Sequence, residues 1–156
     1  MRGAAALVAA LDSGNLFWRE TAQRLIVEIT ETVAIPDLDE VRGFVNRLKT
    51  LGAKIAIDDF GAGYTSFRNL RALGVDIVKI DGAFVQSILK SEDDRAFVHT
   101  LIDLARRLGL KTVAEWVQDE EAAQLLADWG CDWLQGALIG LASDARPWFK
   151  DRAATA

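Results

Sequence analysis

The sequence predicts an α/β fold, and more specifically part of a (β/α)₈ TIM-like barrel with about five strand–helix units. Short apolar strand patterns alternate with amphipathic helix patterns, an order typical of parallel strands covered by helices. A carboxylate, lysine or glutamine stands at or near the end of each predicted strand. Barrel active sites are built from polar groups that converge at the ends of several strands, so this recurrence favours a barrel.

Five short runs, mostly β-branched or apolar, are predicted strands: residues 24–30, 54–58, 76–80, 111–115 and 132–135. We expect the first of them to be a buried strand. Apolar residues at helical spacing predict helices from residue 37 to the glycine at 52, then over 66–73, 83–90, 94–108 and 120–129. Asp37 and Glu40 form a predicted capping box. The helix over 94–108 is expected to turn these residues toward the core: Phe97, Val98, Leu101, Leu104, Ala105 and Leu108.

A doubly wound sheet is the competing architecture. Gly61 and Gly63 follow a predicted strand, but no third glycine completes a dinucleotide-binding fingerprint, so the barrel is preferred. A closed barrel needs about 250 residues, and this sequence has 156. We therefore expect about three N-terminal strand–helix units to be missing. The expected division is a leading helix and linker over 1–24, a partial barrel over 25–143 and a tail over 144–156.

The composition is that of a globular domain, with 51% hydrophobic and 26% charged residues. A net charge of −5 without a Lys/Arg cluster argues against a nucleic acid polymer as partner. The single cysteine, Cys131, cannot form an internal disulfide, which favours a cytoplasmic location. No apolar run approaches the ~20 residues that span a bilayer, so no membrane segment is expected.

Four carboxylates stand at the ends of three predicted strands: Glu28, Asp58, Asp59 and Glu115. Gathered carboxylates repel one another and lose hydration, so we expect cations between them. Oxygen ligands favour hard ions such as Mg²⁺ or Mn²⁺. The adjacent pair Asp58-Asp59 could bridge two ions, an arrangement that supports phosphodiester hydrolysis. Lys79 could hold the attacking water or balance negative charge in the transition state.

Each of these residues also has a purely structural interpretation, and the residues alone leave both open. The structural alternatives are Glu28 on an exposed edge strand, Asp58-Asp59 in a capping turn, Lys79 paired with Asp81, Glu115 paired with Lys111 or capping a helix, and Gln135 bonded to the backbone. Recurrence at strand ends favours a site. It does not by itself exclude another Mg²⁺ barrel enzyme, such as an enolase-like one.

Five segments occur in the order and spacing of one enzyme family. They are Glu28-Ile29-Thr30-Glu31, residues 58–66 (DDFGAGYTS), Val78-Lys79-Ile80-Asp81, residues 112–117 (TVAEWV), and Gly130-Cys131-Asp132 with Gln135-Gly136. The chain resembles the EAL-domain cyclic-di-GMP phosphodiesterases over residues 25–136. The resemblance implies a modified (β/α)₈ barrel in the bacterial cytoplasm. It also implies hydrolysis of cyclic-di-GMP to linear pGpG with two Mg²⁺ or Mn²⁺ ions.

The resemblance further implies residue roles. The metal ligands would be Glu28, Asp58, Asp59 and Glu115, and the catalytic residues would be Lys79 and Glu115. Gln135 and Asp81 would contact the substrate. Glu31 would anchor the loop over 59–66, whose shape depends on Gly61, Gly63 and Tyr64. The implied partners are cyclic-di-GMP and, in a longer protein, GGDEF or sensor domains.

The sequence departs from the family pattern in three places. The Glu-Ala-Leu motif and an asparagine ligand of the family are not found. Trp116 and Gln118 replace a glycine and an acidic residue, and the segment after Gly136 lacks the usual Ser-Arg-Pro ending. We therefore expect this chain alone to hydrolyse cyclic-di-GMP very slowly or not at all.

A non-catalytic cyclic-di-GMP receptor or protein-interaction scaffold is the alternative function. The replaced residues favour it, whereas the retained carboxylates and Lys79 favour an enzyme. The exposed edges of an unclosed sheet also predict self-association or a partner that covers the edge.

Overall fold

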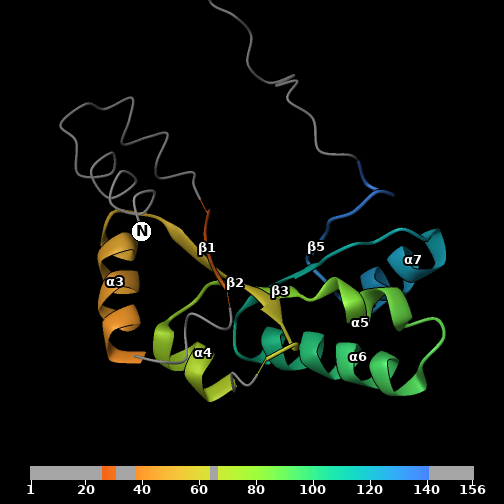
Figure 1. The fold of residues 1–156 in the computed structure, drawn as a ribbon, viewed down its shortest axis with the longest axis horizontal. Helices are drawn as coiled ribbons and strands as arrows, with labels where there is room; N and C mark the ends of the chain where they lie inside the picture. Colours follow the sequence, from red (N-terminus) through yellow and green to blue (C-terminus); the bar gives the residue numbers. More distant parts are fainter. Residues whose placement is uncertain (1–25, 31–37, 64–66, 141–156) are drawn as a thin grey trace, which may run out of the picture.

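The structure, a computed structural model, describes residues 26–30, 38–63 and 67–140 (Figure 1). Its five strands are β1 (Ile26–Thr30), β2 (Lys54–Phe60), β3 (Ile77–Ile80), β4 (Lys111–Ala114) and β5 (Trp133–Leu134). They form one parallel sheet in the order β1-β2-β3-β4-β5. Strands that are neighbours in space are thus consecutive in the sequence, as in a barrel. In a doubly wound sheet, the order of the strands reverses at a switch point. The predicted partial barrel is confirmed.

The helices are α3 (Leu38–Thr50), α4 (Phe67–Leu73), α5 (Gly82–Ser87), α6 (Glu92–Arg107) and α7 (Glu120–Asp128). Each lies between two consecutive strands, with α5 and α6 both between β3 and β4, and Figure 1 shows α3, α4 and α6 along the left and lower sides of the sheet. Within the described residues, every helix is too short or too polar to cross a lipid bilayer.

The core lies between the sheet and these helices. Ile55 and Ile57 of β2 are fully buried and belong to the same cluster as Leu48 of α3, Leu70 of α4 and Ile102 of α6. Alternate residues of a strand point to opposite faces, so a second set of residues, those that alternate with Ile55 and Ile57, points away from these helices. That second set carries the polar residues discussed below.

The strands β2 to β5 begin in a repeated way. A glycine ends the preceding helix, one apolar residue follows, and then comes Lys54, Asp76, Lys111 or Asp132 in turn. Lys54 lies 3.5 Å from Asp76, and Lys111 lies 2.6 Å from Asp132. The two aspartates also accept hydrogen bonds from backbone amides of the neighbouring strands, Ile55 at 3.0 Å and Thr112 at 2.9 Å. These contacts tie adjacent strands together at their amino ends.

Strand β1 is not the buried strand that the sequence predicts. Only Ile29 is buried, and Ile26 is 51% exposed. The reason is topological: β1 is an outer strand whose single described neighbour is β2. An apolar composition predicts a strand but does not reveal whether it lies at an edge.

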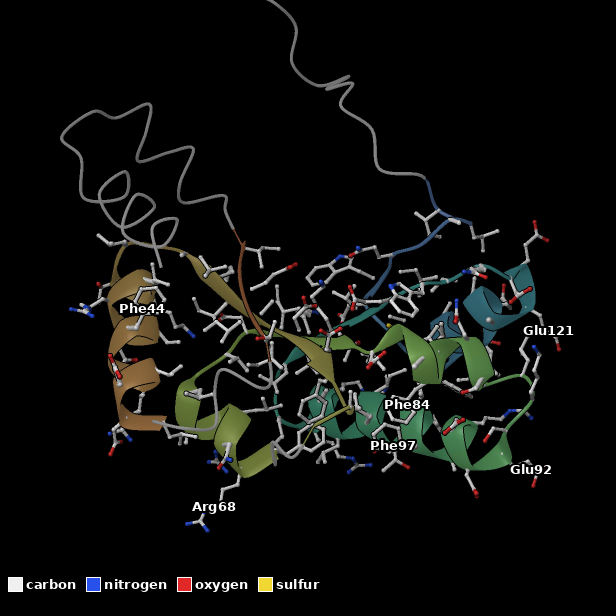
Figure 2. The ribbon with its side chains drawn as sticks, viewed as in Figure 1. Phe44, Arg68, Phe84, Glu92, Phe97 and Glu121 are labelled. Carbon is white, nitrogen blue, oxygen red and sulfur yellow. The ribbon has the colours of Figure 1, made fainter. Side chains whose placement is uncertain are left out.

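Two residues of the predicted helix over 94–108 do not turn toward the core as expected. Phe97 and Leu108 are 39% and 37% exposed. Leu108 is the residue that ends the helix. Phe97 packs instead against Phe84 of α5, with ring centroids 4.8 Å apart, and Figure 2 shows the two rings side by side between these helices. The contact joins neighbouring helices, and both rings also lie close to Gly61, which directly follows β2.

Element boundaries differ from the prediction by one to three residues. The helix α6 begins at Glu92 instead of 94, because Ser91 caps it by accepting a hydrogen bond from the Asp94 amide at 3.2 Å. Strand β2 extends to Phe60, while β5 keeps only two residues, and the predicted helix over 83–90 is α5 over Gly82–Ser87. The predicted cap at Asp37 lies outside the described residues.

Candidate metal and active site

The carboxyl ends of the strands bring one lysine and several carboxylates together. Lys79, from β3, is buried, and its Nζ lies 3.1 Å from Glu28 of β1, 2.6 Å from Asp58 of β2 and 2.8 Å from Glu115 after β4. The register explains this meeting, because Thr30 pairs with Asp58 and Lys79 pairs with Val113. Residues up to 87 positions apart in the sequence, Glu28 and Glu115, thus share one ammonium group.

Strand β2 is irregular where it carries the paired aspartates. Its register against β3 shifts between Ile57 and Phe60. Asp59 has a φ of 55°, in the left-handed region that an L-residue rarely adopts. A strand of regular geometry would direct Asp58 and Asp59 to opposite faces. The irregularity lets carboxylate oxygens of both residues approach the same point, as the next contacts show.

Carboxylate oxygens of Asp58, Asp59 and Glu115 lie within 4.8 Å of one another. Glu28 contacts Lys79 but is not part of this group of three. The donor set is all oxygen and negatively charged, which suits hard divalent cations such as Mg²⁺, Mn²⁺ or Ca²⁺. These residues therefore fit a divalent metal ion.

The pKa values show how poorly these charges are compensated. Burial and the neighbouring Asp58 raise the pKa of Asp59. Burial also raises the pKa of Glu115, and Lys79 opposes that rise without overcoming it. Burial disfavours the charged form of Lys79, but its hydrogen bonds to Asp58, Glu115 and Glu28 prevail and raise its pKa. These contacts favour the cationic form of Lys79, and its single ammonium is shared by three carboxylates.

Two structural interpretations of these residues are wrong. Lys79 does not pair with Asp81, because Asp81 caps α5 by accepting a hydrogen bond from the Ala83 amide at 2.8 Å. Glu115 does not pair with Lys111, whose ammonium binds Asp132 at the opposite end of the sheet. Lys79 and the four strand-end carboxylates lie in one cluster, whereas Gln135 makes no hydrogen bond to it within the described residues.

The other predicted site residues surround this cluster or lie outside the described residues. Asp81 is near enough to Asp59 to contribute to the raised pKa of Asp59. Gln135, just after β5, is exposed, and its backbone bonds to Ala114 at 2.9 Å and Val117 at 3.0 Å. Gly61 has a φ of 110° and lies close to Phe84 and Phe97, and Gly63 follows it in the loop. Glu31 and Tyr64 lie outside the described residues.

Sequence reasoning did not foresee the conformation of Trp116, which directly follows Glu115. Its φ is 55° and it is 55% exposed. The signal was present, because the family pattern has glycine at this position, and glycine accepts a left-handed conformation without strain. Trp116 thus keeps a left-handed backbone although it carries a large side chain.

A parallel, helix-covered sheet with a carboxylate cluster at the carboxyl ends of its strands defines a partial (β/α) barrel with a candidate metal centre. The EAL domain family model matches residues 15–142. The chain belongs to the EAL domain family. Cyclic di-GMP phosphodiesterase PdeF of Escherichia coli K12 is 39% identical over 119 residues, which cover 76% of this chain and 16% of PdeF.

Solved structures support the same membership. The PaMucR phosphodiesterase in complex with c-di-GMP has a TM-score of 0.77 and 33% identity, covering 91% of this chain and 61% of that chain. Klebsiella pneumoniae BlrP1 in a manganese and cyclic-di-GMP complex has a TM-score of 0.69 and 34% identity, covering 74% of this chain and 30% of that chain. The chain spans well under two thirds of the length of the curated relatives that it matches, for example 16% of PdeF.

Proposed function

We propose that this chain contributes the carboxylate and lysine part of an EAL-type phosphodiesterase site that hydrolyses cyclic-di-GMP to linear pGpG. The observation that carries the proposal is the contact of Lys79 with carboxylates from three strands, beside the group Asp58, Asp59 and Glu115. The names of the PdeF and PaMucR relatives support the substrate class.

The metal ligands in this proposal are Asp58, Asp59 and Glu115, with Glu28 at the edge of the group. A bound Mg²⁺ or Mn²⁺ would supply Lewis-acid chemistry, polarising the phosphodiester and making water a better nucleophile. The manganese complex of BlrP1 supports a metal requirement. Asp59 would need its left-handed backbone to keep its carboxylate beside that of Asp58.

Lys79 acts as a fixed positive charge in this proposal. Its hydrogen bonds to the carboxylates raise its pKa, which favours the protonated ammonium. It can donate hydrogen bonds to the attacking water or to a phosphate oxygen as negative charge develops. Its burial among three carboxylates restricts its position, which is what such stabilisation requires. Gln135 and Asp81 are the proposed substrate contacts at the rim.

We expect the 156-residue chain alone to turn over slowly, if at all. Catalysis by two ions needs ligands for both, and the described residues gather one group of three carboxylates. A cyclic-di-GMP receptor is the second candidate, and the exposed indole of Trp116 beside Glu115 favours it.

The test is incubation with cyclic-di-GMP and Mn²⁺, with chromatography of pGpG and calorimetry of binding on the same sample. Glu115→Gln is the matched variant, since it keeps the shape of the side chain and removes its charge. Metal-dependent binding that Glu115→Gln weakens supports the site, and turnover in addition supports an enzyme over a receptor. Absence of both binding and turnover in the wild-type chain contradicts the proposal.

The proposal extends to assembly and location. The outer strands β1 and β5 each pair with one strand in the part of the chain that the structure describes, so we propose that a second copy or a partner covers a sheet edge. A clean monomer in sedimentation would count against this. GGDEF or sensor domains in a longer protein, and a cytoplasmic location, belong to the same proposal. The bifunctional diguanylate cyclase/phosphodiesterase MucR of Pseudomonas aeruginosa, 40% identical over 116 residues that cover 74% of this chain and 17% of MucR, supports a GGDEF partner.

A further inference from the structure

Trp116 has an unusual backbone at the edge of the candidate site. Asp59 and Trp116 are the only non-glycine residues with a positive φ in the described ranges, and each has a φ of 55°. Both stand beside the carboxylate group, Asp59 within it and Trp116 directly after Glu115. Backbone outliers of this kind concentrate at functional sites, where surrounding structure holds them in place. Trp116 therefore warrants a functional interpretation alongside the metal ligands.

The ring of Trp116 is held against the start of α5. Gly82, the first residue of that helix, is buried, and a Cβ added to it would overlap Cγ and Cδ2 of the Trp116 ring. Because Gly82 follows β3 and Trp116 follows β4, the ring spans the carboxyl ends of two neighbouring strands. These are the strands that supply Lys79 and Glu115.

The backbone around Trp116 is fixed on both sides. The Glu115 amide donates to the Ile80 carbonyl at 3.3 Å, and the Val117 amide donates to the Gln135 carbonyl at 3.0 Å. Gly136 approaches so closely that any side chain there would overlap the Val117 backbone. The indole is thus presented from a rigid segment, although 55% of the residue is exposed.

A rigid, exposed indole beside a phosphodiester site has the properties of a base-stacking residue. Aromatic rings stack on nucleobases, and large fused rings provide the greatest contact area at low conformational cost. The neighbouring carboxylates, with a metal ion, would hold a phosphate. A nucleotide whose phosphate bound there would have its base near the carboxyl ends of the strands, where Trp116 lies directly after Glu115.

We propose that Trp116 is a specificity-determining residue that stacks on a purine base of the cyclic dinucleotide. This rests on the proposed function, because it assumes that the phosphodiester binds at the carboxylate group. It adds a determinant of base preference that neither Lys79 nor the carboxylates can supply, since those groups recognise phosphate and metal rather than a base.

The experiment measures binding of cyclic-di-GMP in the presence of Ca²⁺ by calorimetry. The variants are Trp116→Gly, which suits the left-handed backbone and so should fold, and Trp116→Phe, which retains a smaller ring. Trp129→Phe is the control, because Trp129 packs against His99, with ring centroids 5.0 Å apart, and is not one of the residues at the carboxylate cluster. Thermal melts followed by circular dichroism confirm that each variant is folded.

We expect Trp116→Gly to weaken binding by about tenfold or more, and Trp116→Phe by a smaller factor. The same Trp116→Gly change should reduce the preference for cyclic-di-GMP over cyclic-di-UMP, because stacking is stronger for purines. Trp129→Phe should change neither value. A structural role for Trp116 could alter stability but would not alter base preference.

Equal affinity and equal base preference in Trp116→Gly would overturn the stacking proposal while leaving the metal site intact. Tighter binding in that variant would also overturn it, because the ring would then be an obstruction. If the wild-type chain shows no metal-dependent binding at all, the proposed function fails together with this inference. Binding that Glu115→Gln weakens and Trp116→Gly does not distinguishes the two failures.

Discussion

Carboxylates at the two ends of the parallel sheet have different hydrogen-bond partners. At the amino end, Asp76 accepts hydrogen bonds from the Ile55 amide at 3.0 Å and from Lys49 at 3.1 Å. Asp132 is bonded in the same manner to Thr112 and Lys111. At the carboxyl end, carboxylates from three strands share the single ammonium of Lys79.

The pKa values record this difference. Burial opposes ionisation of both Asp76 and Asp132, but backbone amides and lysines outweigh it, so each pKa is lowered. At the other end, burial and neighbouring carboxylates raise the pKa values of Asp59 and Glu115. The amino-end carboxylates thus stabilise the fold, whereas those at the carboxyl end are kept in an arrangement that favours a cation. In barrels, the amino face generally serves stability and the carboxyl face chemistry.

The largest expected effect comes from removing the shared ammonium. Lys79→Met should lower the free energy of unfolding by about 3 kcal/mol, because it leaves partly buried carboxylates without their counterion. Urea denaturation with a chelator present measures this. Addition of Mn²⁺ should restore part of the loss, since a divalent cation can replace the missing charge. A loss below 1 kcal/mol would mean that the carboxylates are already compensated by solvent.

Metal binding should depend on the carboxylates at the carboxyl end of the sheet and not on those at the amino end. A divalent ion at about 100 times its dissociation constant stabilises a protein by about 2.7 kcal/mol, so Mn²⁺ should raise the melting temperature of the wild type. Asp58→Asn should abolish most of that rise, and the matched variant Asp76→Asn should retain it. Thermal melts with and without Mn²⁺ provide the comparison. Equal responses from the two variants would contradict the assignment of the site to the carboxyl end.

Asp76 should contribute a pH-dependent stabilisation of about 2 kcal/mol, typical of hydrogen bonds to a charged group. Its folded pKa is lowered from the usual 3.8, so the contribution is present above that value. It is lost as pH falls through the folded pKa. Asp76→Asn should therefore destabilise the protein at pH 7, and the difference from wild type should shrink below roughly pH 3.8. A difference that is constant from pH 7 to pH 3 would show that charge is not involved.

The smallest expected effect concerns the exposed partner at the amino end. The Lys111 side chain is 58% exposed, so Lys111→Met should cost only about 0.5 kcal/mol, and added salt should reduce the cost further. Denaturation at two salt concentrations tests this. A loss as large as that of Lys79→Met would remove the contrast between the two ends.

Much of the site was predictable because strand ends of a parallel barrel always meet at one edge. Once β1 to β4 were recognised, Glu28, Asp58, Lys79 and Glu115 had to lie near one another. The amino-end aspartates were equally visible, as the repeated glycine-x-lysine and glycine-x-aspartate steps before β2 to β5.

Other features depend on distances that a one-dimensional pattern does not contain. Helical spacing placed Phe97 inward, but its position relative to α5 turned it toward Phe84. An apolar run predicted a buried β1, yet burial depends on how many neighbours the strand has, and β1 has one in the described sheet.

By itself, the sequence determined the order of strands and helices, the parallel sheet and the residue types at the carboxyl edge. It could do so because these follow from periodicity and from the rule that successive β/α units lie side by side. Only the tertiary structure decided that Lys79 touches three carboxylates, that Glu28 is outside the group of three, and that Trp116 lies over Gly82. These outcomes depend on strand register, on the irregularity in β2 and on the sign of φ at two residues. Each is set by packing between segments far apart in the chain.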